Sequence, residues 1–168
     1  MVMRMVQAVL ILPGTAIVLV PGVIIWATAG SDYAAVLPDP GQLQFWLGLV
    51  FSFAGLFLGS WTAKLFVSIG QGTPAPWDPP QKLVIKGPYR HVRNPMITSV
   101  VLMLAGEAMV VQSWPIAAWG LFFFAANCVY FPLSEEKGLE RRFGEDYRVY
   151  KANVPRWLPR LTPWQPPQ

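Results

Sequence analysis

Apolar residues run through this chain in long blocks that carry almost no charge. No charged residue occurs in residues 5–31 or 40–63, and the block 94–134 contains only Glu107. A membrane helix needs about 20 mostly apolar residues to cross about 30 Å of hydrocarbon. Each block is therefore long enough to hold at least one span.

The third block is divided by the polar turn Gln112-Ser113-Trp114-Pro115, because a proline favours the first turn of a new helix. The pattern predicts an all-α, multi-pass membrane protein with about four helices. They cover about Met5 to Ala27, Leu43 to Val67, Met96 to Val111 and Pro115 to Leu133. The last two are short, which favours a tight helical hairpin.

The first predicted helix contains Pro13 and Pro21, which are tolerated as kinks inside a membrane. A secretory signal peptide is the alternative, with Arg4 as its basic region and Ala27-Thr28-Ala29 as a cleavage site. The apolar stretch is longer than such a signal requires. A membrane helix is therefore favoured.

Composition agrees with a membrane protein, since 54% of the 168 residues are hydrophobic and 13% are charged, against about 25% charged in typical soluble domains. Of the 13 basic residues, Arg4 precedes the first helix, five lie at the end of the second helix or in the loop after it, and seven follow the fourth. The other two connections carry Asp32 and Asp39. By the positive-inside rule, both termini and residues 68–94 are expected in the cytoplasm, and a bacterial inner membrane fits this arrangement.

The same basic residues could indicate nucleic acid, but they flank membrane helices, and contact with anionic lipid explains them. One cysteine, Cys128, excludes an intramolecular disulfide, and one histidine, His91, excludes zinc sites rich in His or Cys. The chain has no Gly-x-Gly-x-x-Gly or Walker loop. We therefore expect no nucleic-acid partner, no metal and no Rossmann-type cofactor turn.

Two patterned segments, 81–95 and 134–150, flank the predicted hairpin and should emerge side by side. At the first, Asn94 suits an N-cap and Pro95 the first helical position, so the free N–H groups of residues 96–98 could bind a carboxylate or phosphate. Arg90 and Arg93 add positive charge. The alternative is that this sequence only begins a helix and the arginines hold lipid headgroups.

In the second segment, Ser134 can cap a helix whose first turn holds Glu135 and Glu136, where negative charge is stabilised. The pair has either this structural role or a role in binding a cationic ligand group. Downstream, an apolar stripe at four-residue spacing (Leu139, Phe143, Tyr147) predicts a cytoplasmic interfacial helix, interrupted at Gly144. The Pro-rich residues 154–168 predict an extended strap on the surface.

Glu107 is the one charge inside a predicted helix core. An intramembrane acid is by default a functional candidate, but Glu107 lies roughly 16 Å from the beginning of its helix at 1.5 Å per residue. A polar contact between helices is the favoured interpretation.

Four blocks occur in an order that resembles the superfamily of isoprenylcysteine carboxyl methyltransferases and phospholipid methyltransferases. They are Gly87-Pro88-Tyr89-Arg90-x-Val92-Arg93-Asn94-Pro95, Glu135-Glu136, Phe143-Gly144-Glu145-x-Tyr147 and Val154-Pro155-Arg156. The resemblance covers about residues 81–164, half of the chain. It implies an integral membrane methyltransferase that uses S-adenosylmethionine, a methyl donor that needs no metal, with a lipidic or small hydrophobic acceptor reaching the site from the membrane lipids.

The resemblance also implies positions for the site. Cofactor-binding residues would be Gln81, Lys82, Leu83, Val84, Tyr89, Asn94, Pro95, Met96, Ile97, Glu135 and Glu136, with Glu135 at the ammonium or ribose end. Arg90, Arg93 and Glu135 are the candidates for the reaction itself, the arginines for structure or for anionic substrate groups.

Three positions depart from the family pattern. The family's Arg-His-Pro-x-Tyr reads Arg93-Asn94-Pro95-Met96-Ile97 here, so the histidine is replaced by an asparagine and the phenol by an aliphatic side chain. Phe131 stands where prenylcysteine enzymes have a base for the substrate carboxylate, which disfavours that substrate. A non-catalytic membrane module of the same fold, or a related membrane reductase using a nicotinamide cofactor, are the alternatives.

The chain is thus expected to form one membrane domain, 1–168. Residues 1–67 would supply the first two transmembrane helices, and residues 68–168 the cofactor-binding loop, the hairpin and the interfacial helix. The sequence does not fix an oligomeric state.

Overall fold

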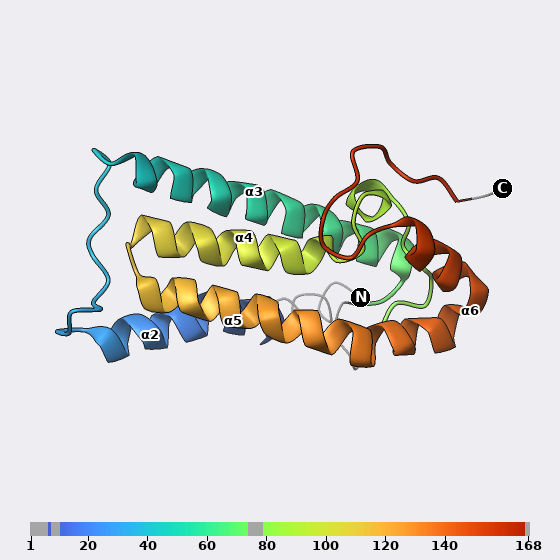
Figure 1. Cartoon of the computed structure of the whole chain (residues 1–168), viewed down its shortest axis with the longest axis horizontal. Coiled ribbons are helices and arrows are strands. Elements are labelled where there is room, and N and C mark those ends of the chain that lie inside the picture. Colours follow the sequence, from blue (N-terminus) through green and yellow to red (C-terminus); the bar gives the residue numbers. More distant parts are fainter. Residues whose placement is uncertain (1–6, 8–10, 74–78, 167–168) are drawn as a thin grey trace.

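The computed structural model describes residues 7, 11–73 and 79–166, which form a helical bundle with no strand among them (Figure 1). Three helices lie side by side along the long axis: α3 (Leu43–Leu65), α4 (Pro95–Val110) and α5 (Trp114–Tyr130). The shorter α2 (Val20–Thr28) packs against α5. The prediction of an all-α fold is confirmed.

Among the described residues, three helical runs are long and apolar enough to cross a membrane: Ile11–Thr28, Leu43–Gly70 and Trp114–Asn153. They expose large apolar side chains, as lipid-facing helices do; Phe53 is 66% and Leu121 72% exposed. The remaining apolar helix, α4, has 16 residues and is about 24 Å long, less than the hydrocarbon thickness of about 30 Å. The predicted count of four spans is therefore not confirmed.

The first helical run is irregular near its prolines, in the form of a π-helical turn, η1 (Thr15–Leu19). The N–H of Val20 donates to the carbonyl of Thr15, five residues back. In that register the next donor would be Pro21, which has no N–H. Residues 1–6 and 8–10, including Arg4 and the expected helix start at Met5, lie outside the described residues.

This irregular turn leaves the carbonyl of Ala16 without its helical donor, and a side chain from another helix replaces it. The indole Nε1 of Trp119 on α5 donates to the Ala16 oxygen over 2.9 Å. Ala16 also belongs to a buried cluster with Val100 and Leu104 of α4. The π turn thus anchors the first run to the rest of the bundle.

Helices α3 and α4 approach closely because small residues line their contact. A Cβ atom added to Gly106 would lie 2.2 Å from the Ser52 hydroxyl, and one added to Gly55 would lie 2.7 Å from the Ser99 carbonyl. Both distances are shorter than van der Waals contact allows. Glycine is therefore required at these two positions by the spacing of the helices.

Helices α4 and α5 form the predicted tight hairpin. Between Val110 and Trp114, Gln112 adopts a positive φ of 49° and Ser113 is the N-cap of α5. The Ser113 hydroxyl accepts the backbone N–H of Ile116 over 3.4 Å, which satisfies one free donor of the new helix.

Helix α5 does not end where the sequence suggested. It continues through a π turn, η4 (Phe131–Glu135), into α6 (Glu136–Asn153). Ser134 lies inside this turn and caps nothing, so the predicted helix start there is wrong. The apolar part of the run ends at Leu133, so the charge-rich α6 that follows is expected to lie outside the membrane. Gly144, with φ 56° and ψ −127°, interrupts α6 as predicted.

The charged segments gather at one end of the bundle (Figure 1). After α3 and its π-helical extension η2 (Phe66–Gly70), the chain forms a loop with the short 3₁₀ helix η3 (Gly87–Arg90). This loop, α6 and the C-terminal residues meet there, while the α2–α3 connection and the α4–α5 turn lie at the other end. Which end faces the cytoplasm stays a prediction.

Candidate functional site

The beginning of α4 leaves backbone donors unused. Asn94 precedes the helix with φ −119° and ψ 53°, and its carbonyl accepts the first helical bond from the N–H of Thr98 over 3.1 Å. The N–H groups of Met96 and Ile97, which come earlier in the first turn, have no acceptor within the helix. Such a helix end attracts carboxylates and phosphates.

The side chain of Asn94 does not cap this helix, contrary to the expectation from its position. Asn94 is the N-cap residue, but it makes no side-chain cap hydrogen bond. Its amide Nδ2 is buried and has no hydrogen-bond partner among the described residues. Buried polar groups are rarely left unsatisfied. An amide donor is therefore free beside a helix N-terminus whose first N–H groups have no acceptor within the helix.

Tyr89 lies in η3 and is 6% exposed. Its ring packs in a buried cluster with Leu65 and Val84, and its centroid lies 5.7 Å from that of Phe66. Burial, and next the neighbouring Tyr150, raise the pKa of the Tyr89 phenol well above its usual value. Tyr89 fixes the loop against the end of α3 and stays protonated at neutral pH.

Residues 81–84 are anchored between α3 and α6. The N–H groups of Gln81 and Lys82 both donate to the Gly70 carbonyl, over 2.8 and 3.2 Å, while their side chains are exposed. Val84 belongs to the buried cluster of Tyr89, whereas Leu83 packs against a second buried cluster, which contains Tyr147 and Tyr150 of α6. The structure thus brings the two patterned segments together.

The apolar stripe predicted on α6 forms this second cluster. Leu139, Phe143 and Tyr147 all contribute to it, together with Tyr150 and Val154. The stripe therefore faces the loop that leads to α4.

Glu136 is 2% exposed and is surrounded by three cations. Its Oε1 accepts Arg93 Nη1 at 2.9 Å and Arg156 Nε at 2.6 Å, and its Oε2 lies 3.2 Å from Lys151 Nζ. Burial by itself raises the pKa of Glu136, but the hydrogen bonds from Arg156 and Lys151 and the charge of Arg93 outweigh it, so the pKa is lowered. The charge of Glu136 is satisfied within the chain.

Glu135, the other acid of the pair, has a different environment. It is half-buried at the end of η4. Its carboxylate is close to the Tyr130 hydroxyl and to the Arg142 guanidinium. Because Glu136 is already paired with three cations, Glu135 is the better candidate of the two acids for binding a cationic group of a ligand.

Arg90 and Arg93 are both engaged with acceptors of this chain. Arg90 Nε donates to the Trp164 carbonyl over 2.6 Å, and Arg93 pairs with Glu136. The sequence did not predict that C-terminal residues would bind these side chains, as the Trp164 carbonyl binds Arg90. The one signal in the sequence for a role of the C-terminal residues was Arg156, which belongs to the last of the four motif blocks.

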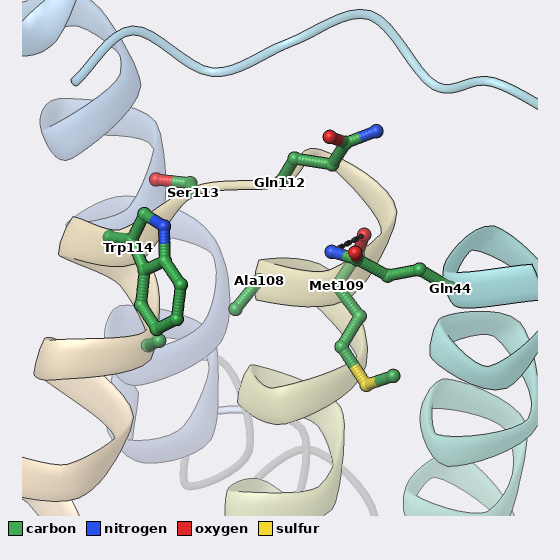
Figure 2. A pocket seen from close by; sticks show the side chains of 7 residues that line it. Gln44, Ala108, Met109, Gln112, Ser113 and Trp114 are labelled. Carbon is green, nitrogen blue, oxygen red and sulfur yellow. Dashed lines mark hydrogen bonds between the residues drawn. The ribbon is translucent and has the colours of Figure 1, made fainter. Parts of the chain in front are cut away.

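Two hollows in the described part of the chain lie away from these residues. One of about 240 Å³ sits at the α4–α5 turn (Figure 2) and is lined by Gln44, Ala108, Met109, Gln112, Ser113, Trp114 and Ala117, none of which is ionisable. The other, of about 360 Å³, lies on the outer face of α3 and is lined by Phe57, Ser60, Trp61 and Lys64. Neither contains a predicted site residue. The first lacks the charged groups that a zwitterionic ligand requires, so the unsatisfied donors at α4 are better evidence for a site.

One carboxylate oxygen of Glu107 is unpaired, because Oε2 is buried without a hydrogen bond among the described residues. The amide of Asn127 donates to the Phe123 carbonyl over 2.8 Å.

The described residues thus form an all-helical fold with helices apolar enough to span a membrane, in which two segments distant in sequence lie together. The family model described as phospholipid methyltransferase matches residues 43–146. The chain belongs to this family of membrane methyltransferases, which is part of the superfamily of the isoprenylcysteine carboxyl methyltransferases. No curated protein sequence and no solved structure matches the chain.

Proposed function

We propose that the protein transfers a methyl group from S-adenosylmethionine to a small or lipidic nucleophile that reaches the site from the bilayer. The observation that carries this proposal is the unsatisfied donor set at the beginning of α4. The Nδ2 of Asn94 is buried without a partner, next to the free N–H groups of Met96 and Ile97. These donors fit the carboxylate of the cofactor's amino-acid end.

The remaining cofactor groups also find suitable residues. Glu135 is half-buried and offers a carboxylate to the α-ammonium, while residues 81–84 and Tyr89 form the adjoining wall. Glu136 acts in this proposal through Arg93, because its own charge is already paired. The cofactor is thus held by one helix end, one acid and a stretch of loop.

S-adenosylmethionine supplies a methyl carbon made electrophilic by a sulfonium. The acceptor's lone pair forms the new bond to this carbon as the carbon–sulfur bond breaks, with its electrons passing to sulfur, and a protic acceptor releases its proton. The task of the chain is to align the reactants and exclude water, which can contribute about 7 to 11 kcal/mol.

The neighbourhood of Phe131 supports an acceptor without a carboxylate. Its ring centroid lies 5.8 Å from that of Trp157, which in turn lies 5.1 Å from that of Phe124. An aromatic wall replaces the base that a carboxylate would need. An amine, thiol or hydroxyl acceptor is therefore favoured.

Two measurements test the proposal. Isothermal titration of the protein in nanodiscs with S-adenosylhomocysteine should show binding, and Glu135→Gln should weaken it at least tenfold. Glu145→Gln is the matched control, because Glu145 is exposed and pairs only at the surface with Arg148, among the described residues. The absence of binding at millimolar ligand would overturn the proposal.

The second measurement separates a methyltransferase from a non-catalytic module. Extracted membrane lipids and small thiols are incubated with the protein and methyl-labelled S-adenosylmethionine. Label in an extracted product supports transfer. If the protein binds S-adenosylhomocysteine but transfers label to no acceptor, the non-catalytic module is favoured.

A further inference from the structure

The C-terminal strap, residues 154–164, lies against the segment that leads into α4. Backbone hydrogen bonds join the Pro155 carbonyl to the N–H of Arg93 (2.9 Å), the His91 carbonyl to the N–H of Arg160 (3.0 Å) and the Arg90 carbonyl to the N–H of Trp164 (2.9 Å). As one segment advances the other runs back, so the two are antiparallel. The strap is therefore docked along its length.

Side chains add to this docking. Arg90 Nε returns a bond to the Trp164 carbonyl, and the His91 ring nitrogen Nδ1 lies 2.8 Å from the Arg160 carbonyl. The rings of Trp164 and Tyr150 lie 5.9 Å apart. The strap falls outside residues 43–146, to which the family match extends.

Arg156 connects the strap to the residue before Asn94. It binds Glu136 at two points, Nε to Oε1 at 2.6 Å and Nη2 to Oε2 at 3.1 Å. The same Oε1 accepts Arg93 Nη1. Arg93 is consequently held at its guanidinium through Glu136 and at its N–H by Pro155.

We infer that Arg156 is a positioning residue of the site at the beginning of α4. By fixing Glu136, and with it Arg93, the strap sets where the amide of Asn94 and the first N–H groups of the helix point. This inference rests on the proposed function only for the identity of the ligand. The positioning of the α4 start is a property of the protein without ligand.

The experiment compares Arg156→Ala with Arg148→Ala. Both remove an arginine paired with a glutamate, but the Arg148 side chain is 64% exposed and its partner Glu145 74% exposed, whereas Glu136 is buried. Hydrogen exchange of residues 90–98 is measured without ligand, and the Kd for S-adenosylhomocysteine by titration. Arg156→Ala should speed exchange at Arg93 and Thr98, whose N–H groups are bonded to the carbonyls of Pro155 and Asn94, and should raise the Kd at least tenfold, while Arg148→Ala changes neither.

Arg156→Lys is a second variant in case Arg156→Ala does not fold. Lysine keeps the positive charge but cannot bind Glu136 at two points as arginine does. This variant should have a Kd between those of the wild type and Arg156→Ala. Wild-type exchange at residues 90–98 in a folded Arg156 variant, or an equal effect of Arg148→Ala, overturns the inference. If the wild type binds no S-adenosylhomocysteine, the proposed function fails, and the exchange measurement still decides the positioning role.

Discussion

The hydroxyl of Tyr150 donates a 2.8 Å hydrogen bond to the backbone carbonyl of Tyr89, and both residues are buried. The bond joins α6 to η3 just before the candidate site. It therefore connects the two segments independently of the ion pairs around Glu136.

Removing this hydroxyl should destabilise the protein. Tyr150→Phe keeps the ring but leaves the Tyr89 carbonyl without its donor, which costs about 1 to 2 kcal/mol. Chemical denaturation in detergent, followed by tryptophan fluorescence, measures the change. Tyr33→Phe is the control, because Tyr33 is 66% exposed. Equal stability of Tyr150→Phe and the wild type would contradict the importance of this bond.

The contact between α3 and α4 should not tolerate a larger residue at Gly106. In Gly106→Ala the new methyl group lies 2.2 Å from the Ser52 hydroxyl, and overpacking of this kind costs about 1 to 3 kcal/mol. Gly22→Ala is the matched control in α2, since a Cβ there meets nothing within 4 Å and alanine is the better helix former. Thermal unfolding should show a lower midpoint for the first variant and an equal or higher one for the second. The reverse order would show that the helices separate easily.

The bounds of the helices were predicted correctly where a local sequence signal marked the end of an apolar block. The predicted start at Leu43 is that of α3, and the prediction from Met96 to Val111 differs from α4 by one residue at each end. Charges bounded these blocks, and Asn94-Pro95 marked the beginning of α4. A membrane segment is determined largely by its own composition, so local information sufficed.

The site was only partly predictable, because its geometry depends on contacts distant in sequence. The juxtaposition of the two segments followed from the hairpin. The partners of Glu136 did not, since Arg93 and Arg156 lie 43 and 20 residues away. Ser134 is a good cap by type, yet the helix continues past it through a π turn, which no local preference indicated.

The ion pairs of Glu136 predict a specific dependence on pH. The folded pKa of Glu136 is below its unfolded value, so its charge stabilises the protein above the unfolded pKa, near 4.3, and this contribution is lost as the pH falls through the folded pKa. Glu136→Gln should be about 2 kcal/mol less stable than the wild type at pH 6. The difference should shrink below about pH 4.

Unfolding midpoints of both proteins between pH 6 and pH 3 measure this convergence. Glu145→Gln corrects for general effects of losing an acid, because Glu145 is 74% exposed. A difference in unfolding midpoint between Glu136→Gln and the wild type that stays constant with pH would mean that the charge of Glu136 does not contribute to stability.

The last prediction separates the helix-starting role of Asn94 from its role in binding. The Asn94 side chain makes no cap hydrogen bond that Asp would lose, and the charge of Asp is favourable at a helix N-terminus. Asn94→Asp should therefore leave the unfolding midpoint unchanged or raise it. If the cofactor carboxylate lies at this helix end, the same change places two negative charges together and removes the free Nδ2 donor. The Kd for S-adenosylhomocysteine should then rise at least tenfold, and more than in Asn94→Ala, which removes the donor without adding a charge. Unchanged binding in a stable Asn94→Asp would move the carboxylate away from α4, whereas stability and binding lost in parallel would assign Asn94 a structural role alone.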